Sequence, residues 1–153
     1  MRFRYARVNP NAKPLRRGHP TDAGMDICIP TDWHDGQPFD LAFGESIVID
    51  SGIKIEIDPG YMVLEGNKGG IASKRHLLLG AHISDSYYSG TVFIDIHNVG
   101  KETQTLIPGE KIAQLIIVPI VPAIPEETTE DKLYEDMITT EYRGEGKQGS
   151  TGV

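Results

Sequence analysis

Four short stretches of the chain combine glycine with side chains that can bind or activate a phosphate ester. They are residues 21–26, 66–74, 80–90 and 143–153. Glycines let a backbone approach a ligand closely and point N–H groups at an anion. Carboxylates can act as a general base or as oxygen ligands for a metal ion, and basic side chains hold phosphate oxygens. The four stretches therefore suggest a site for a phosphate-bearing ligand.

Residues 66–74, GNKGGIASK, have the composition of a phosphate cradle. Lys68 supplies a charge suited to phosphate, and Gly69 and Gly70 leave the backbone free to approach an anion. The spacing differs from that of a P-loop, because the pattern GxxxxGK[ST] is absent. This stretch alone is weak evidence for phosphate binding.

Residues 80–90, GAHISDSYYSG, are predicted to form a hairpin between two strand-like segments. The backbone of such a hairpin could read the polar edge of a flat ring. Asp85 is a candidate general base, and Tyr88 is a candidate stacking platform. A plain hairpin with a surface carboxylate is the alternative.

The first and last stretches are individually ambiguous. Asp26 follows a flexible glycine, Gly24, and precedes an apolar stretch, and a lone aspartate in a loop is usually a turn or cap residue. The tail carries Arg143, Ser150 and Thr151 among glycines, which could cradle phosphate or form a frayed chain end.

The elements that must position these residues are mainly short strands. Residues 53–57 alternate between isoleucine and charged residues, residues 92–96 form another β-rich run, and residues 112–118 are almost wholly apolar. Gly and Pro separate these runs at short intervals, which is typical of an all-β sandwich or barrel. One short helix is predicted around residues 73–79, where Gly and Pro are absent.

Proline spacing marks the predicted end of the folded body. Pro119, Pro122 and Pro125 recur at every third residue, as in an extended connector. We therefore expect a β domain over residues 1–125, and a linker with a glycine-rich arm over residues 126–153.

The composition narrows the class of protein. A net charge of −7 argues against non-specific binding to nucleic acid. We see no signal peptide and no apolar run near the ~20 residues of a membrane span, so we expect no membrane partner. The single cysteine, Cys28, suits a reducing compartment, which predicts a soluble cytoplasmic protein.

Taken in order and together with residues 108–115, the four stretches resemble the five motifs of the trimeric, all-β dUTP diphosphatases (dUTPases), over nearly the whole chain. The matching segments are residues 23–26 (AGMD), 67–72 (NKGGIA), 83–90 (ISDSYYSG), 108–115 (PGEKIAQL) and 143–152 (RGEGKQGSTG). The last two segments are the most specific. The resemblance implies a jelly-roll or distorted β-barrel with one short helix and a flexible C-terminal arm.

The resemblance also implies a reaction and a set of roles. The expected reaction is Mg²⁺-dependent hydrolysis of a deoxynucleoside triphosphate, with dUTP as the favoured substrate. Asp85 would activate the attacking water, and Asp26 would hold Mg²⁺ through a water molecule. The base and sugar residues it implies are Ala81, His82, Ile83, Tyr88 and Gln148. The phosphate-binding residues it implies are Lys68, Gly69, Gly70, Gln114, Arg143, Gly149, Ser150 and Thr151. A homotrimer that exchanges arms between subunits is the expected assembly.

Several residues depart from the family pattern and leave alternatives open. Lys68 stands in place of an arginine, Gly69 of a serine, His82 of a glycine, Lys147 of a glycine and Gln148 of a phenylalanine. These changes are compatible with drift in a dUTPase, or with a preference for dCTP, dATP or a modified pyrimidine. A dCTP deaminase, which in this fold carries a glutamate near the position of Asp95, and a non-catalytic nucleotide-binding regulator are further alternatives.

Overall fold

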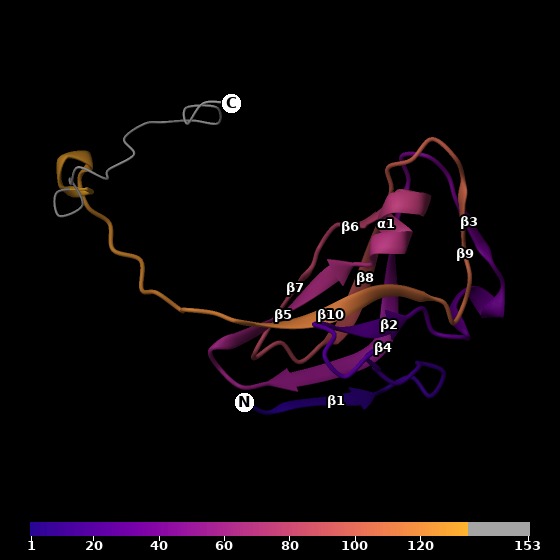
Figure 1. The fold of residues 1–153 in the computed structure, drawn as a ribbon, viewed down its shortest axis with the longest axis horizontal. Helices are drawn as coiled ribbons and strands as arrows, with labels where there is room; N and C mark the ends of the chain where they lie inside the picture. The colour runs from indigo at the N-terminus through magenta and orange to yellow at the C-terminus, as the bar shows by residue number, and fades with distance from the viewer. Residues whose placement is uncertain (135–153) are drawn as a thin grey trace. The chain divides into compact units, whose positions relative to one another are not determined.

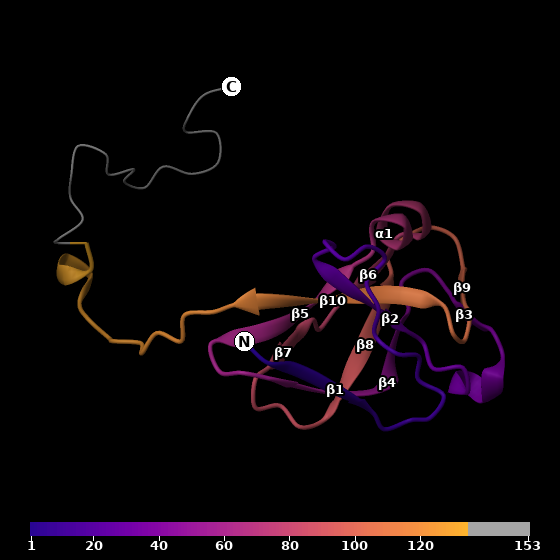
Figure 2. The same cartoon turned by 60° about the horizontal axis from the view of Figure 1, so that its bottom comes forward.

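The computed structural model describes residues 1–134, which are mostly β-structure (Figures 1 and 2). The strands are β1 (Phe3–Arg7), β2 (Gly24–Cys28), β3 (Phe39–Leu41), β4 (Ser46–Ile57), β5 (Tyr61–Asn67), β6 (Leu77–Leu79), β7 (Ile83–Asp85), β8 (Thr91–Asn98), β9 (Gln104–Leu106) and β10 (Lys111–Pro119). The helical elements are α1 (Gly69–Arg75) and the 3₁₀ turns η1 (Trp33–Gly36) and η2 (Glu130–Lys132). The prediction of a mostly β fold with one short α-helix is confirmed.

Two four-stranded sheets and one short strand pair build the fold. The first sheet has the order β1-β4-β8-β6, the second β2-β10-β5-β7, and β3 pairs with β9. All pairs are antiparallel. By its contacts the chain divides into two units, Met1–Val121 and Pro122–Val153, and both sheets belong to the first.

The core follows from alternation along the long strands. In β4, Ile53, Ile55 and Ile57 are buried and Lys54 between them is exposed. In β8, the even-numbered residues from Val92 to Asn98 are buried. In β10, a central strand, none of residues 112–118 is exposed. The strands predicted over 53–57, 92–96 and 112–118 are confirmed.

The position of the helix differs from the prediction. Residues 73–79 were expected to be helical, but α1 ends at Arg75 because His76 adopts a left-handed conformation (φ 53°). Leu77–Leu79 then form β6, which pairs with residues 96–98 of β8. Leu77 is buried there, so tertiary pairing overrides the local helical preference.

The segment of residues 80–90 also differs from the expected hairpin. β7 pairs with β5 in one sheet, whereas β8 pairs with β4 and β6 in the other. The segment therefore crosses between the sheets, and no ladder joins β7 to β8.

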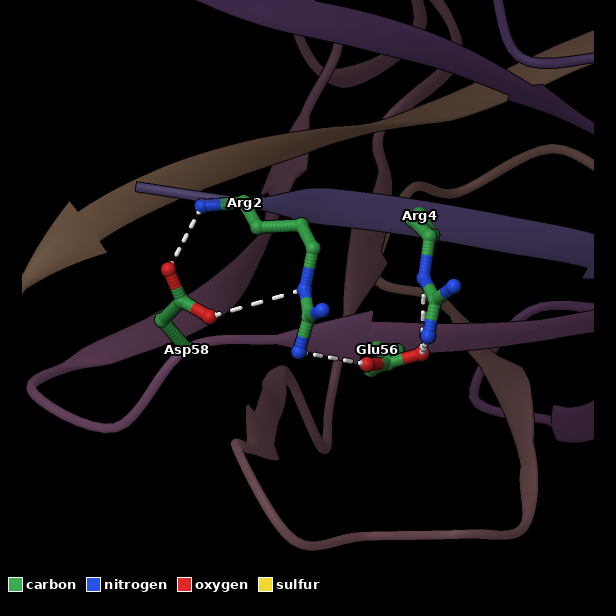
Figure 3. Close-up of polar contacts among 4 residues, drawn as sticks. All are labelled: Arg2, Arg4, Glu56 and Asp58. Atoms are coloured by element: carbon green, nitrogen blue, oxygen red, sulfur yellow. Dashed lines mark hydrogen bonds and ion pairs between the residues drawn. The ribbon is translucent and has the colours of Figure 1, made fainter.

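Ion pairs fasten β1 to the end of β4 (Figure 3). Arg2 pairs with Glu56 at 3.1 Å and with Asp58 at 3.8 Å, and Arg4 pairs with Glu56. The four side chains are at least one-third exposed, so each pair stabilises the fold by about 1 kcal/mol or less. Both arginines are thus engaged with carboxylates at this edge of the first sheet.

Residues 122–134, the described part of the second unit, are exposed throughout. Within residues 1–134, no helix has the length and apolarity that crossing a bilayer requires. The tail residues to which the sequence assigned ligand contacts, Arg143, Gln148, Gly149, Ser150 and Thr151, lie outside the described residues.

Candidate functional site

Two separate groups of side chains contain the residues that the sequence singled out. The first group lies where β2, β10 and the end of β5 run side by side. Gln114 on β10 lies opposite Asp26 on β2 and opposite Gly66 on β5. Asp26, Gln114 and Lys68 line one pocket of about 300 Å³, with Gly24 among the other lining residues. Strand register thus brings together three residues that are far apart in the sequence.

Asp26 is held between two lysines. Lys68 donates a hydrogen bond to Asp26 Oδ1, and Lys111 Nζ lies 2.8 Å from Oδ2. Burial alone would raise the pKa of Asp26, but the hydrogen bonds from Lys111 and Lys68 outweigh it and hold the pKa below its usual value. Asp26 is therefore an ionised carboxylate over the physiological pH range.

The amide of Gln114 is fixed by a tight fit against glycine. Its Nε2 donates to Asn67 O at 3.0 Å. A Cβ atom at Gly24 would lie 2.1 Å from Gln114 Oε1, which is far inside van der Waals contact. Glycine at position 24 is therefore required for Gln114 to keep this position.

Gly69 and Gly70 begin α1 next to Lys68 in open space. A Cβ atom at either glycine would meet nothing within 4 Å. The packing of the described chain therefore does not demand glycine at these positions, and both residues leave open space beside Lys68.

The second group surrounds a pocket of about 130 Å³ where β7 and β8 diverge. The pocket is lined by Glu65, Ala81, Ile83, Ser84, Tyr88, Thr91 and Phe93. β7 is the edge strand of its sheet, and the pairing of β6 with β8 covers only residues 96–98. Where the two strands border this pocket, their backbone groups on that side do not pair with another strand. They can therefore form hydrogen bonds with the edge of a flat polar ring.

Asp85 and Tyr88 lie at the turn that closes the segment. Asp85 is exposed at the end of β7, and its carbonyl accepts the N–H of Tyr88 at 3.1 Å. The Tyr88 hydroxyl donates to Thr91 O at 3.1 Å. A Cβ atom at Gly90 would lie 2.2 Å from this hydroxyl, so Gly90 leaves room for the tyrosine ring.

Asp95 anchors the other end of the segment. Its Oδ2 accepts the N–H of Ala81 at 3.0 Å, and its Oδ1 lies 3.2 Å from His97 Nε2. The ring of His82 bonds to Gly80 O at 2.7 Å, and His82 is exposed and does not line the pocket. Asp95 thus accepts a backbone hydrogen bond at the start of the segment, and the His82 ring turns back toward Gly80.

Sequence reasoning missed Glu65, a buried carboxyl group beside this pocket. Only 6% of Glu65 is exposed, and Ser84 Oγ donates to its Oε1 at 3.3 Å. Burial raises the pKa of Glu65 to about 7, against the opposing effect of the Ser84 hydrogen bond. The available signal was a charged residue at an inward position of an alternating strand, two residues after the fully buried Val63.

The described residues suit a magnesium ion only if they bind it through its water molecules. Within residues 1–134 no group of three or more His, Cys, Asp or Glu side chains could hold a metal ion. Mg²⁺ retains several waters and needs only one or two carboxylates when phosphates supply the remaining oxygens. Asp26, ionised and facing the pocket of Lys68 and Gln114, fits the single-carboxylate role.

The two groups lie apart within one chain. Asp85 pairs with Met62 near the start of β5, whereas Gln114 pairs with Gly66 near its end. From Met62 to Lys68 the chain advances six residues, or about 20 Å at ~3.3 Å per residue. A single copy of the chain does not bring Asp85 to Asp26 and Lys68.

Comparison with known sequences identifies relatives over most of the chain. The family model for dUTPase matches residues 11–152. The deoxyuridine 5′-triphosphate nucleotidohydrolase of Pectobacterium carotovorum is 35% identical over 136 residues, covering 87% of this chain and 82% of that enzyme. The enzyme of the same name from Cutibacterium acnes is 36% identical over 147 residues, covering 94% and 88%.

Solved structures give the same result for the fold. The dUTPase of Staphylococcus bacteriophage 80alpha, as a G164S mutant with dUpNHpp, superposes with a TM-score of 0.77 at 27% identity over 99% of each chain. A D95N mutant dUTPase from phage phi11 of S. aureus, for which coordination of a structural Mg(II) ion is described, has a TM-score of 0.72 at 26% identity, covering 88% of this chain and 99% of that one.

Proposed function

This chain belongs to the dUTPase family, and from that premise we propose that its site hydrolyses dUTP to dUMP and pyrophosphate. The observation that carries the proposal is the pocket between the free edges of β7 and β8, with Tyr88 in its lining and Asp85 at the adjoining turn. This arrangement places a candidate general base beside a slot that suits a pyrimidine ring. The enzyme is a dUTP diphosphatase.

Asp85 acts as the general base. Its exposed carboxylate takes a proton from a water molecule, and the water oxygen attacks the α-phosphorus. The bond between the α-phosphorus and the α,β-bridging oxygen breaks, and pyrophosphate leaves with the electron pair. The exposure of Asp85 in the single chain leaves it open to substrate and water.

The triphosphate binds at the first group. Lys68 supplies positive charge, Gln114 an amide donor, and the Gly69-Gly70 backbone a close approach. When bound, Mg²⁺ neutralises charge on the triphosphate. Asp26 would hold this ion through a water molecule, and its hydrogen bond keeps Lys68 at the pocket.

The base and sugar bind at the second group. Main-chain donors and acceptors of Ala81 and of β7, which begins at Ile83, bind the polar edge of uracil. Tyr88 packs against the deoxyribose. The His82 side chain does not line this pocket, so a histidine in place of the family's glycine is compatible with binding of dUTP.

A homotrimer would complete the site. Because Asp85 and Lys68 are about 20 Å apart along β5, the second group of one subunit must meet the first group of another. In this arrangement the arm, with Arg143, Gln148, Gly149, Ser150 and Thr151, closes over the bound nucleotide and excludes water. An arm from a neighbouring subunit suits the connector that begins after Val121.

Product analysis across a nucleotide panel tests the function. Pyrophosphate release should be measured with Mg²⁺ on dUTP, dCTP, dTTP, dATP, dGTP and UTP, with ammonia measured in parallel. We expect pyrophosphate and dUMP from dUTP, weak turnover of the others, and no ammonia. Ammonia release from dCTP would contradict the proposal and assign Asp95 a chemical role. An absence of turnover on every nucleotide would support a binding protein instead.

A further inference from the structure

We propose that Glu65 is a specificity-determining residue, whose free carboxyl oxygen hydrogen-bonds the polar edge of the pyrimidine ring in the pocket between β7 and β8. No other residue of the pocket lining presents an unpartnered buried side-chain oxygen within residues 1–134. The inference rests on the proposed function and concerns how the same site distinguishes uracil from cytosine.

The geometry of Glu65 leaves one oxygen for a ligand. Oε1 accepts from Ser84 Oγ at 3.3 Å, whereas Oε2 is buried without a hydrogen-bond partner among the described residues. The backbone N–H of Glu65 donates to His82 O at 2.8 Å, which fixes the residue against the base-reading segment. An unpaired buried polar atom is costly, so a ligand that pairs with it gains affinity and specificity.

The surroundings decide the charge of this carboxyl group. His82 and Ser84 approach it from the β7 side, and Asp95 acts on it from β8. On β10 the residue opposite is the apolar Leu115, and Tyr88 is the remaining titratable residue of the pocket lining. Burial is the largest influence and raises the pKa of Glu65 to about 7.

Two protonation states would therefore read two different bases. The protonated carboxyl group can donate an O–H to a ring carbonyl oxygen, as on the edge of uracil. The ionised group only accepts, so it favours an exocyclic amino group, as on cytosine, and repels a carbonyl oxygen. Preference for uracil over cytosine should fall as the pH rises through the pKa of Glu65.

The experiment is a pH profile of base preference. The ratio of kcat/KM for dUTP to that for dCTP should be measured from about pH 5.5 to about pH 8.5, which spans the pKa of Glu65. We expect the ratio to fall roughly tenfold or more over this range. Ionisation of the triphosphate, which the two substrates share, cancels in the ratio.

Two variants separate specificity from stability. Glu65→Gln keeps the shape but cannot ionise, so its ratio should be independent of pH. Glu102→Gln removes an exposed carboxylate elsewhere and should retain the pH-dependent ratio of the unaltered protein. A ratio in Glu65→Gln that still follows that of the unaltered protein would overturn the inference.

A binding measurement covers the case in which Glu65→Gln does not fold. Calorimetric affinities of the unaltered protein for dUMP and dCMP should change in opposite directions between the two ends of the pH range. Unchanged relative affinities would also overturn the inference. Normal dUTP turnover with a dUTP-to-dCTP ratio of kcat/KM that does not change with pH contradicts only the role of Glu65. An absence of turnover on every nucleotide contradicts the proposed function itself.

Discussion

Asp85 and Lys68 lie at opposite ends of β5. Asp85 pairs with Met62, near the first residue of the strand, and Lys68 follows directly after its last residue, Asn67. About 20 Å of extended chain separates them, which exceeds the reach of either side chain. If Asp85 activates water and Lys68 binds phosphate, as proposed, the two residues of one site would come from different copies of the chain.

Mixed trimers should regain activity from two inactive variants. Asp85→Asn and Lys68→Met chains, each nearly inactive alone, would form trimers in which some sites take both functional residues from different subunits. Random mixing of equal amounts should restore about a quarter of full activity, since each of the two residues is intact at a given site with a probability of about one half. The measurement is dUTP turnover after unfolding and refolding the two chains together. No recovery would place both residues in one subunit's site.

Asp85→Asn should remove turnover and spare binding. Loss of a general base lowers kcat by about 10²- to 10⁴-fold. The isosteric amide leaves the pocket between β7 and β8 unchanged, because Asp85 does not line it. Pyrophosphate release and calorimetric binding of dUTP check the two halves of this expectation. Asp40→Asn, a change at an exposed residue that accepts from Thr105 Oγ1, is the matched control and should retain normal activity.

Gly24→Ala should weaken phosphate binding by displacing Gln114. The new methyl group would lie 2.1 Å from Gln114 Oε1, so the amide must leave Asn67 O. Losing this hydrogen-bonded position should raise the KM for dUTP about tenfold, equivalent to ~1.4 kcal/mol. Gln114→Ala and the double variant complete a cycle. If the glycine acts through the glutamine, the two effects will not add, and full additivity would contradict the mechanism.

The ligand-free protein should lose stability as the pH rises from about 4.5 to about 7 because of Glu65. Its folded-state pKa, about 7, lies above the ordinary 4.5, so the folded chain holds a proton that the unfolded chain has released between these values. The free energy of unfolding should fall across this window by up to about 3 kcal/mol and level off above it. Urea unfolding of the unaltered protein and of Glu65→Gln measures the difference. Parallel pH profiles would mean that Glu65 is not protonated in the fold.

Asp26→Asn should weaken the response to magnesium. The carboxylate is ionised because its pKa is lowered by Lys111 and Lys68 against the effect of burial, and an amide cannot attract the hydrated cation in the same way. The Mg²⁺ concentration for half-maximal activity should rise about tenfold or more. Because its pKa is lowered from the ordinary value, Asp26 stays charged at mildly acidic pH, so the effect of the substitution should be constant from mildly acidic to alkaline pH. An unchanged magnesium titration would remove Asp26 from the metal site.

The sequence predicted those features that depend on local pattern. Alternation over residues 53–57 and 92–96 marked the inward faces of β4 and β8, and turn residues indicated an all-β fold. The motif residues Asp26, Lys68 and Gln114 do share one pocket. The roles of the tail residues, the arm exchange and the cytoplasmic location stay predictions.

The features that the sequence did not predict depend on tertiary partners. Leu77–Leu79 has no Gly or Pro and could be helical or extended, and only its pairing with β8 decides. The segment after Gly80 has the composition of a hairpin, but β7 finds its partner in β5. Glu65 occupies an inward position, and its importance follows from a pocket that exists only because β7 and β8 do not pair.

The unpaired edges of β7 and β8 also bear on how this enzyme can diverge. A recognition surface made of main-chain groups is nearly independent of which side chains are attached to it, provided that the strands keep their separation. His82 illustrates this tolerance, because its imidazole turns back to Gly80 and leaves the pocket lining unaltered. Side-chain substitutions in this segment should therefore be tolerated, whereas changes to the anchors at its two ends, Asp95 and the Asp85–Tyr88 turn, should shift the edges themselves.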